Sequence, residues 1–458
     1  MNDSRVNPAM AEAALPPPPA YYRWSVLVVI SLAMFGNYYV YDAISPIATL
    51  LRDQLGFSDK NIGTLNAIYS FPNIFMVLIG GIIIDRIGVR RASIIFGALC
   101  LGGAAITAAT GKLYVMASGR LIFGIGAESL IVAVTTALAR WFRGKELSFA
   151  FGVNLTIARL GSFLALNSPT WAKGAFDNWQ GPLLITVALG TFCVVGPLVY
   201  ALMEGRAVKQ FSMKKEGGAD KISFSGIFRM SPSYWFVVAL CVTFYAGIFP
   251  FQTFAVKFFV DAHGRTNEEG GSLSGMLTLF AMFATPLFGL LVDRVGRRAL
   301  FMMAGSLLLL PVYLLMAYTT MPELLLGTLS INVFGLFVWH LPFYVPMILM
   351  GVAFSLIPAV MWPSVAYIVP EEKLGTAYGL MTMIQNIGLF GFNLIIGWAN
   401  DHSMASGTNP DGYRLGMWIF SVTGFLGFFF AWMLRRSETG PHAHGLETIT
   451  VKSGKGAS

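Results

Sequence analysis

Charged side chains are scarce in this chain. Only 12% of its 458 residues are Asp, Glu, Lys or Arg, whereas 55% are hydrophobic and the mean hydropathy is +0.66. Soluble domains carry about twice that share of charge. A run of about 20 apolar residues is long enough to cross a bilayer, and many such runs follow one another here. The composition excludes a soluble protein and predicts an all-α membrane protein.

Residues that bind metals or carry nucleophilic chemistry are also few. The three cysteines, Cys100, Cys193 and Cys241, fall in separate apolar runs without metal-ligand or disulfide spacing. We interpret them as small core side chains. The five histidines lie in expected loops or in the tail, and no nucleophile clusters with a base and an acid. We therefore expect no metal, no cofactor and no enzymatic activity.

The apolar runs predict twelve transmembrane helices. We place them at residues 24–48, 61–84, 92–111, 113–139, 147–171, 182–203, 233–258, 272–292, 299–319, 344–369, 376–398 and 413–434. Lys257 falls at the end of the seventh segment, where we expect its side chain to snorkel to the external surface.

Basic residues are unevenly divided between the expected loops. The loops after the even-numbered segments, up to the tenth, together hold 16 Lys or Arg, and the opposite loops hold fewer than half as many. The positive-inside rule places the richer loops, and hence both termini, in the cytoplasm. This asymmetry accounts for the net charge of +8 without a nucleic-acid partner. The expected partners are the lipid bilayer and a small-molecule substrate.

Two internal matches indicate a repeat, which is common in transporters. Residues 81–91 correspond to 289–298, and residues 147–152 correspond to 374–379. We predict two six-helix halves at 24–204 and 232–435, a cytoplasmic linker at 205–231, disordered tails at 1–23 and 436–458, and an insertion near 320–343. We expect an interfacial or external excursion for the insertion, because a thirteenth span would reverse the topology downstream.

The first repeated loop has the pattern Gly-x-x-x-Asp-Arg-x-Gly-x-Arg-Arg, which resembles the signature loop of the major facilitator superfamily. The resemblance implies the major facilitator fold. The Asp can accept hydrogen bonds from a helix N-terminus, and the arginines can pair with acidic groups, so these loops are expected to hold one conformation. The residues that we expect to control conformation are Gly81, Asp85, Arg86, Arg90, Arg91, Gly289, Asp293, Arg294, Arg297 and Arg298. We add Arg120, near the external start of the fourth segment, and Pro250, which would bend the seventh.

Glu128 and Arg159 lie near the middle of the fourth and fifth segments. An ionised side chain at that depth costs roughly 3 kcal/mol or more, so such a residue usually faces a cavity, a partner or a substrate. One interpretation is a buried ion pair that joins the two helices. The other is a site for a zwitterion, in which the carboxylate receives an ammonium group and the guanidinium binds a carboxylate.

Other polar and aromatic residues are placed so that they can line a cavity, because residues four apart share one helical face. Each of them is also compatible with ordinary packing. The candidates are Asn37, Tyr41, Tyr69, Asn73, Tyr245, Phe249, Trp362, Gln385 and Asn386.

Five stretches carry a closer resemblance, to the lysosomal dipeptide uniporter family within the superfamily. They are Gly124 to Leu130, Trp141 to Leu147, Ala158 to Ser162, Trp362 to Pro370 and Leu374 to Gly379. The resemblance spans residues 24–435 and implies an alternating-access transporter of dipeptides, with Glu128 at the peptide amino end, Arg159 at its carboxylate and Trp362 in the cavity.

The transport mechanism and the location are less constrained. The second half lacks an acidic residue within its segments, so we expect uniport, with Asp42 and Glu128 as the candidate proton carriers if transport is coupled. Alternatives are a proton-coupled peptide or amino-acid transporter and an organic-anion carrier. The N-terminal tail lacks an acidic dileucine sorting signal, so we expect a bacterial relative in the plasma membrane. We expect a monomer, and the sequence does not indicate whether an accessory subunit exists.

Overall fold

The computed structural model describes residues 16–142, 147–211, 230–318, 330–333, 337–370, 374–441 and 443–448. These residues are almost all helical. Their one sheet is an antiparallel hairpin of β1 (Ser330–Val333) and β2 (Phe337–His340), in which Ser330 pairs with His340 and Val333 with Phe337. The described part of the chain is therefore an all-helical bundle with one small hairpin.

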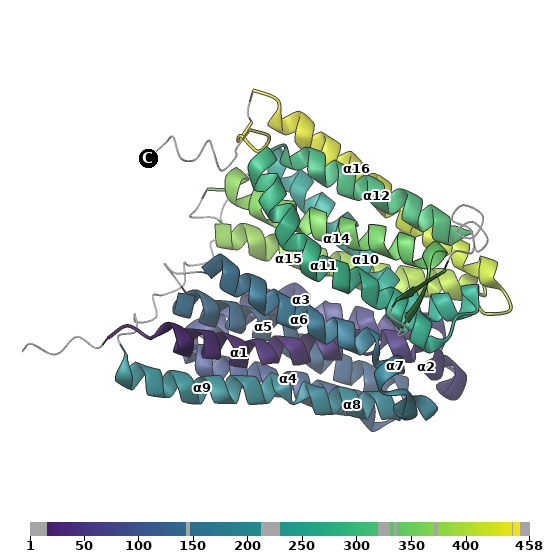
Figure 1. Ribbon diagram of the computed structural model, residues 1–458, viewed down its shortest axis with the longest axis horizontal. Coiled ribbons are helices and arrows are strands. Elements are labelled where there is room, and N and C mark those ends of the chain that lie inside the picture. The colour runs from purple at the N-terminus through teal and green to yellow at the C-terminus, as the bar shows by residue number, and fades with distance from the viewer. Residues whose placement is uncertain are drawn as a thin grey trace, which may run out of the picture.

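The first bundle comprises the elements that occupy the lower part of Figure 1. Its elements are α1 (Ala20–Asp42), η1 (Ser45–Ile47), α2 (Ala48–Leu55), α3 (Asp59–Ile87), α4 (Val89–Ala109), α5 (Leu113–Phe142), α6 (Leu147–Leu166), α7 (Ser168–Trp171), η2 (Lys173–Asp177), α8 (Gln180–Gly190) and α9 (Phe192–Gln210).

The second bundle comprises the helices that lie beside the first, in the upper part of Figure 1. Its helices are α10 (Pro232–His263), α11 (Asn267–Val295), α12 (Arg298–Ala317), α14 (Leu341–Ile368), α15 (Leu374–His402), η5 (Pro410–Tyr413) and α16 (Arg414–Glu438).

The helix α1 begins and α16 ends at the same end of the molecule, which we call the tail end (Figure 1). The opposite end, which we call the hairpin end, carries β1, β2, α2 and α7. The strands occupy part of the segment for which an external excursion was expected, and residues 319–329 and 334–336 lie outside the described residues. Most of the expected linker, at 212–229, also lies outside them.

The described helices are long and apolar enough to cross a membrane at eleven places. These stretches coincide with eleven of the twelve predicted segments. The remaining segment, at 147–171, coincides with α6, whose apolar part Ala150–Leu166 is shorter. The predicted segment at 182–203 is interrupted, because α8 ends at Gly190 and α9 begins at Phe192.

Turn residues at the hairpin end set where the long helices start. Gly56 has φ +69 and ends α2, and the Ser58 side chain accepts from Asn61 N at the start of α3. Thr266 and Glu269 form a capping box that begins α11. Such local bonds satisfy amide groups that the first helical turn leaves free.

Among the described residues, the hydrophobic core shared by the two bundles lies toward the hairpin end. One cluster of buried side chains lies within the first bundle, from Val26 to Ala207. The other cluster fills the second bundle and includes Ile44, Leu51 and Leu65 of the first. The hairpin end of the molecule is therefore tightly closed.

A close helix crossing contributes to this closure. A Cβ added at Gly63 of α3 would lie 2.3 Å from the carbonyl oxygen of Asn393, and one at Gly397 of α15 would lie 2.6 Å from that of Asp59. Only glycine permits α3 and α15 to approach so closely at these two positions.

The C-terminal segment differs from the prediction of disorder. Residues 437–441 and 443–448 fold back onto the second bundle, and Leu446 is fully buried. The carbonyl of Glu447 accepts from Arg297 N at 3.0 Å, and its carboxylate accepts from Ala299 N at 2.7 Å. Glu447 thus caps the N-terminus of α12, where an acidic group is favourable.

Candidate functional site

Glu128 of α5 and Arg159 of α6 lie within the bundle and are partly buried. The structure contains no ion pair between these two described side chains. The guanidinium of Arg159 instead lies over the ring of Phe354, with its Cζ atom 4.6 Å from the ring centroid. Because Phe354 belongs to α14 of the second bundle, this contact joins the two bundles. The interpretation as a direct ion pair is therefore wrong for this conformation.

Tyr38 of α1 connects the surroundings of these two charges. Its phenol lies within electrostatic range of Arg159, Glu128 and Asp42, and the Asp42 carboxylate lies near the Ser162 side chain of α6. Sequence reasoning missed Tyr38, although its spacing of four residues from Asp42 was a usable signal. A phenol can donate or accept, so Tyr38 suits either end of a polar ligand.

An aromatic wall extends from the first bundle into the second. Tyr41 lies 4.9 Å from Tyr69 and 5.9 Å from Phe249, measured between ring centroids. Phe249 stacks on Tyr245 at 5.6 Å, and Trp362 donates from Nε1 to the Tyr245 hydroxyl at 3.0 Å. The structure thus brings together these five predicted residues.

Two further aromatic residues complete this wall and were missed by sequence reasoning. The Tyr378 hydroxyl donates to the carbonyl of Trp362 at 2.9 Å. Phe354 packs on Phe249 with centroids 5.8 Å apart, besides its contact with Arg159. Apolar aromatic residues are common in any buried helix, so the sequence offers no signal that separates these two from the core.

The four predicted amide residues lie at varied places. Asn37 donates to Ala127 O at 3.2 Å, and Asn386 donates to Thr382 O at 3.0 Å, so both amides are engaged by helix backbone. Asn73 is fully buried near Tyr69 without a well-formed hydrogen bond. Gln385 accepts from Cys241 Sγ at 3.5 Å. The structure does not gather these amides around one point.

Arg120 is fully buried and connects three helices of the first bundle. It donates to Leu65 O at 3.3 Å, Val40 O at 2.9 Å, Tyr41 O at 3.2 Å and Asn66 Oδ1 at 2.7 Å. The guanidinium also lies 5.4 Å from the Tyr69 ring centroid. Arg120 therefore positions Tyr41 and Tyr69.

Polar bonds between the bundles close the site toward the hairpin end. The Ser45 hydroxyl donates to Gln252 O at 2.6 Å. Asn66 donates to the Thr253 hydroxyl at 2.9 Å, which donates in turn to Asn393 Oδ1 at 3.0 Å. A polar cavity of about 10 Å³ remains here, lined by Tyr41, Asp42, Ser45, Asn66, Phe249, Gln252 and Thr253. Its volume matches a single water molecule.

The first signature loop lies at the tail end, between α3 and α4. Arg86, Arg90 and Arg91 are exposed and line a cavity of about 670 Å³ together with Arg140 and Glu204, which form an ion pair. The side chain of Asp85 lies outside the described residues.

The second loop has a different arrangement. Arg298 is buried, with its guanidinium 4.5 Å from the Tyr367 ring centroid, whereas Arg294 and Arg297 are exposed. The side chain of Asp293 lies outside the described residues. A Cβ at Gly81 or Gly289 would meet no atom within 4 Å. The expected latch function of both loops therefore stays a prediction. The expected bend at Pro250 also stays a prediction, and α10 continues through this residue as one helix.

Comparison with known proteins identifies the family. Residues 30–340 and 254–450 match the model of the Major Facilitator Superfamily. The chain belongs to this superfamily. The lysosomal dipeptide transporter MFSD1 of Danio rerio is 31% identical over 389 residues, covering 82% of this chain and 80% of the relative. The MFSD1 of Homo sapiens is 30% identical over 407 residues, covering 86% and 83%.

A solved structure of a superfamily member has the same fold. The bacterial homologue of the human lysosomal transporter Spinster, in an inward-facing and occupied conformation, matches with a TM-score of 0.67 and 16% identity. The match covers 92% of this chain and 98% of that one. The predicted family and helical architecture of the present chain are confirmed, and the chain is a multi-pass membrane transporter.

Proposed function

We propose that this protein transports dipeptides by alternating access, as a monomer that binds both ends of the peptide. Glu128 receives the amino group, Arg159 binds the carboxylate, and the aromatic wall around Tyr245, Phe249 and Trp362 contacts the peptide side chains. The similarity to the MFSD1 proteins, which are named lysosomal dipeptide transporters, supports this substrate class.

The state of Arg159 carries this proposal. Its buried Nε has no hydrogen-bond partner among the described residues. An unsatisfied buried donor is unfavourable by about 1–3 kcal/mol, so a ligand oxygen at this position is stabilised. The contact with the Phe354 ring, 4.6 Å from Cζ to the ring centroid, holds the guanidinium on one side, and a guanidinium can bind a carboxylate with two parallel hydrogen bonds.

The positive-inside rule supports a cytoplasmic tail end, which makes this conformation closed to the outside. The lack of a dileucine signal supports the plasma membrane, whereas the relatives bear lysosomal names, so a lysosomal membrane also fits. Uniport is our preferred mechanism. Proton coupling is the second candidate, because Asp42 is a buried carboxylate beside Arg159.

A thermal-shift screen of the purified protein tests the substrate class. We expect dipeptides with free termini to raise the unfolding temperature, and N-acetylated or C-amidated dipeptides to lose most of that effect. Glu128→Gln should remove the response while the control Glu268→Gln, at a partly exposed carboxylate of the hairpin end, retains it. Equal stabilisation by capped and free peptides would contradict recognition of the termini.

Flux into proteoliposomes separates the two mechanisms. A uniporter follows the dipeptide gradient and ignores an imposed pH gradient. Proton uptake driven by peptide, and lost in Asp42→Asn, would instead establish proton coupling.

A further inference from the structure

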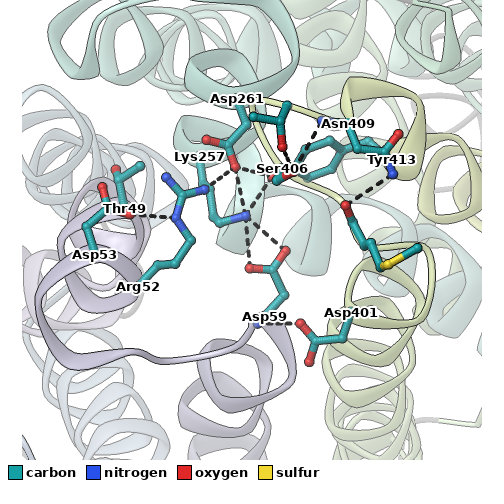
Figure 2. Close-up of polar contacts among 12 residues, drawn as sticks. Thr49, Arg52, Asp53, Asp59, Lys257, Asp261, Asp401, Ser406, Asn409 and Tyr413 are labelled. Atoms are coloured by element: carbon teal, nitrogen blue, oxygen red, sulfur yellow. Dashed lines mark hydrogen bonds and ion pairs between the residues drawn. The ribbon is translucent and has the colours of Figure 1, made fainter.

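A buried lysine lies at the centre of a polar cluster at the hairpin end (Figure 2). Lys257 of α10 is only 1% exposed, so the prediction of a snorkelling side chain is wrong. Its ammonium lies 3.0 Å from Asp59 Oδ1, 2.9 Å from Asp261 Oδ2 and 2.7 Å from the Tyr413 hydroxyl. An ammonium has three donors, and these three partners account for all of them.

The partners of Lys257 come from both bundles. Asp59 begins α3 in the first bundle, whereas Asp261 lies one turn further along α10 and Tyr413 lies in η5. Arg52 of α2 pairs with Asp261 from the other side, as Figure 2 shows. The cluster thus contains two cations and two anions, with one of each on either bundle.

A neighbouring contact strengthens the same junction. The carboxylate of Asp401, at the end of α15, accepts from the backbone N atoms of Asp59 at 2.8 Å and Lys60 at 2.9 Å. An acidic group at a helix N-terminus is favourable, and this one comes from the opposite bundle. The start of α3 is therefore held by two separate contacts with the second bundle.

The bonds of Lys257 are asymmetric with respect to movement of the bundles. If the hairpin end opens, Lys257 keeps Asp261 and Tyr413, which belong to its own bundle, and loses only Asp59. Asp59 keeps none of these partners and enters water. A charge left in a buried site without its partner is strongly unfavourable, whereas a solvated or paired charge is not.

We propose that Lys257 is the gate residue of the hairpin end: its bond to Asp59 holds this end closed, and Asp261 and Tyr413 retain the ammonium when the end opens. This inference rests on the proposed alternating access. The Lys257–Asp59 pair sets the preference for the conformation seen here, and Asp261 prevents a lone buried cation in the other.

Cysteine cross-linking without substrate tests the inference. The side chains of Thr49 and Asn267 touch across the bundles at 2.9 Å, so Thr49→Cys/Asn267→Cys reports closure in a background where the three native cysteines are replaced by Ala. We expect Lys257→Met to slow cross-linking by a short bifunctional thiol reagent at least tenfold, because Asp59 then lacks its cation and lies in a buried site beside the carboxylate of Asp261, which retains Arg52.

The ion pair between Lys173 and Glu268, 2.9 Å apart, provides a matched control because it also joins the two bundles and its cation, Lys173, is 80% exposed. Exposed pairs contribute little, so Lys173→Met should change the cross-linking rate less than twofold. Size-exclusion chromatography and thermal unfolding identify variants that fail to fold.

The double variant Lys257→Met/Asp59→Asn distinguishes a gate from general damage. It removes one charge from each bundle and leaves Asp261 with Arg52, so we expect cross-linking within threefold of the parent protein. The inference would be overturned if Lys257→Met cross-linked at the parent rate. It would also be overturned if Lys257→Met/Asp59→Asn cross-linked no faster than Lys257→Met. Because the assay uses no peptide, failure of dipeptide transport leaves this result interpretable.

Discussion

Replacing Arg159 should separate the contributions of charge and of hydrogen-bond geometry to dipeptide binding. Arg159→Met removes both bonds to the peptide carboxylate, and Arg159→Lys keeps the charge but loses the planar fork. Met also retains apolar contact with Phe354, which limits collapse of the site. The pair of variants therefore tests the chemistry of the guanidinium rather than the volume of the side chain.

The expected magnitudes follow from the two bonds. A hydrogen bond to a charged group contributes about 1.5–3 kcal/mol, so Arg159→Met should weaken dipeptide binding by about 3–6 kcal/mol, or roughly 10²- to 10⁴-fold in Kd. Arg159→Lys, which loses about one of the two bonds, should weaken it roughly 10- to 150-fold.

Isothermal titration calorimetry of a free dipeptide measures these constants in detergent. Lys173→Met is the control, because it removes an exposed cation far from the aromatic wall, and its Kd should match that of the parent protein. Binding by Arg159→Met within threefold of the parent would refute the assignment of the carboxylate to Arg159. Equal losses in Met and Lys would refute the argument from fork geometry.

Three further variants test the framework. Arg120→Met leaves four buried acceptor groups without their donor and should lower the free energy of unfolding by at least about 3 kcal/mol, measured by denaturant titration; an unchanged midpoint would contradict its positioning role. Gly63→Ala forces a Cβ against a carbonyl of α15 and should cost about 1–3 kcal/mol, whereas Gly81→Ala, which points into open space, should be tolerated in the same titration. Glu447→Ala removes the cap of α12 and should cost about 1 kcal/mol; faster limited proteolysis after residue 438 is the expected sign, and unchanged cleavage would argue against docking of the tail.

The sequence identified the membrane helices and the two mid-span charges because both follow from the composition of one segment and from the free energy of placing a charge in it. A charged residue within an apolar run is unfavourable wherever the helix goes, so Glu128 and Arg159 could be selected before any contact was known. Their partners could not be selected in this way. Phe354 differs from other core aromatics only in lying opposite Arg159, which depends on how two separate bundles meet.

Lys257 is a second residue whose partner the sequence does not indicate. Its relation to Asp261, four residues along one helix, is readable from the sequence, but Asp59 lies 198 positions away. The expectation of snorkelling rested on the position of Lys257 at the end of its segment, and it considered no partner on another helix. The tail is a similar case, because Glu447 accepts from Ala299 N, 148 residues earlier, and the polar composition around it gave no sign of that contact.

The charge balance of the hairpin-end cluster has an electrical consequence. Arg52 and Asp59 move with one bundle, and Lys257 and Asp261 move with the other, so this set of four charges is divided into two neutral pairs when the bundles separate. A net charge carried across the membrane field would change the energy by about 2.3 kcal/mol per 100 mV, and these four residues carry none. A zwitterionic peptide is neutral as well. The opening of these two ion pairs is therefore expected to add no voltage dependence of its own to the flux of a neutral peptide.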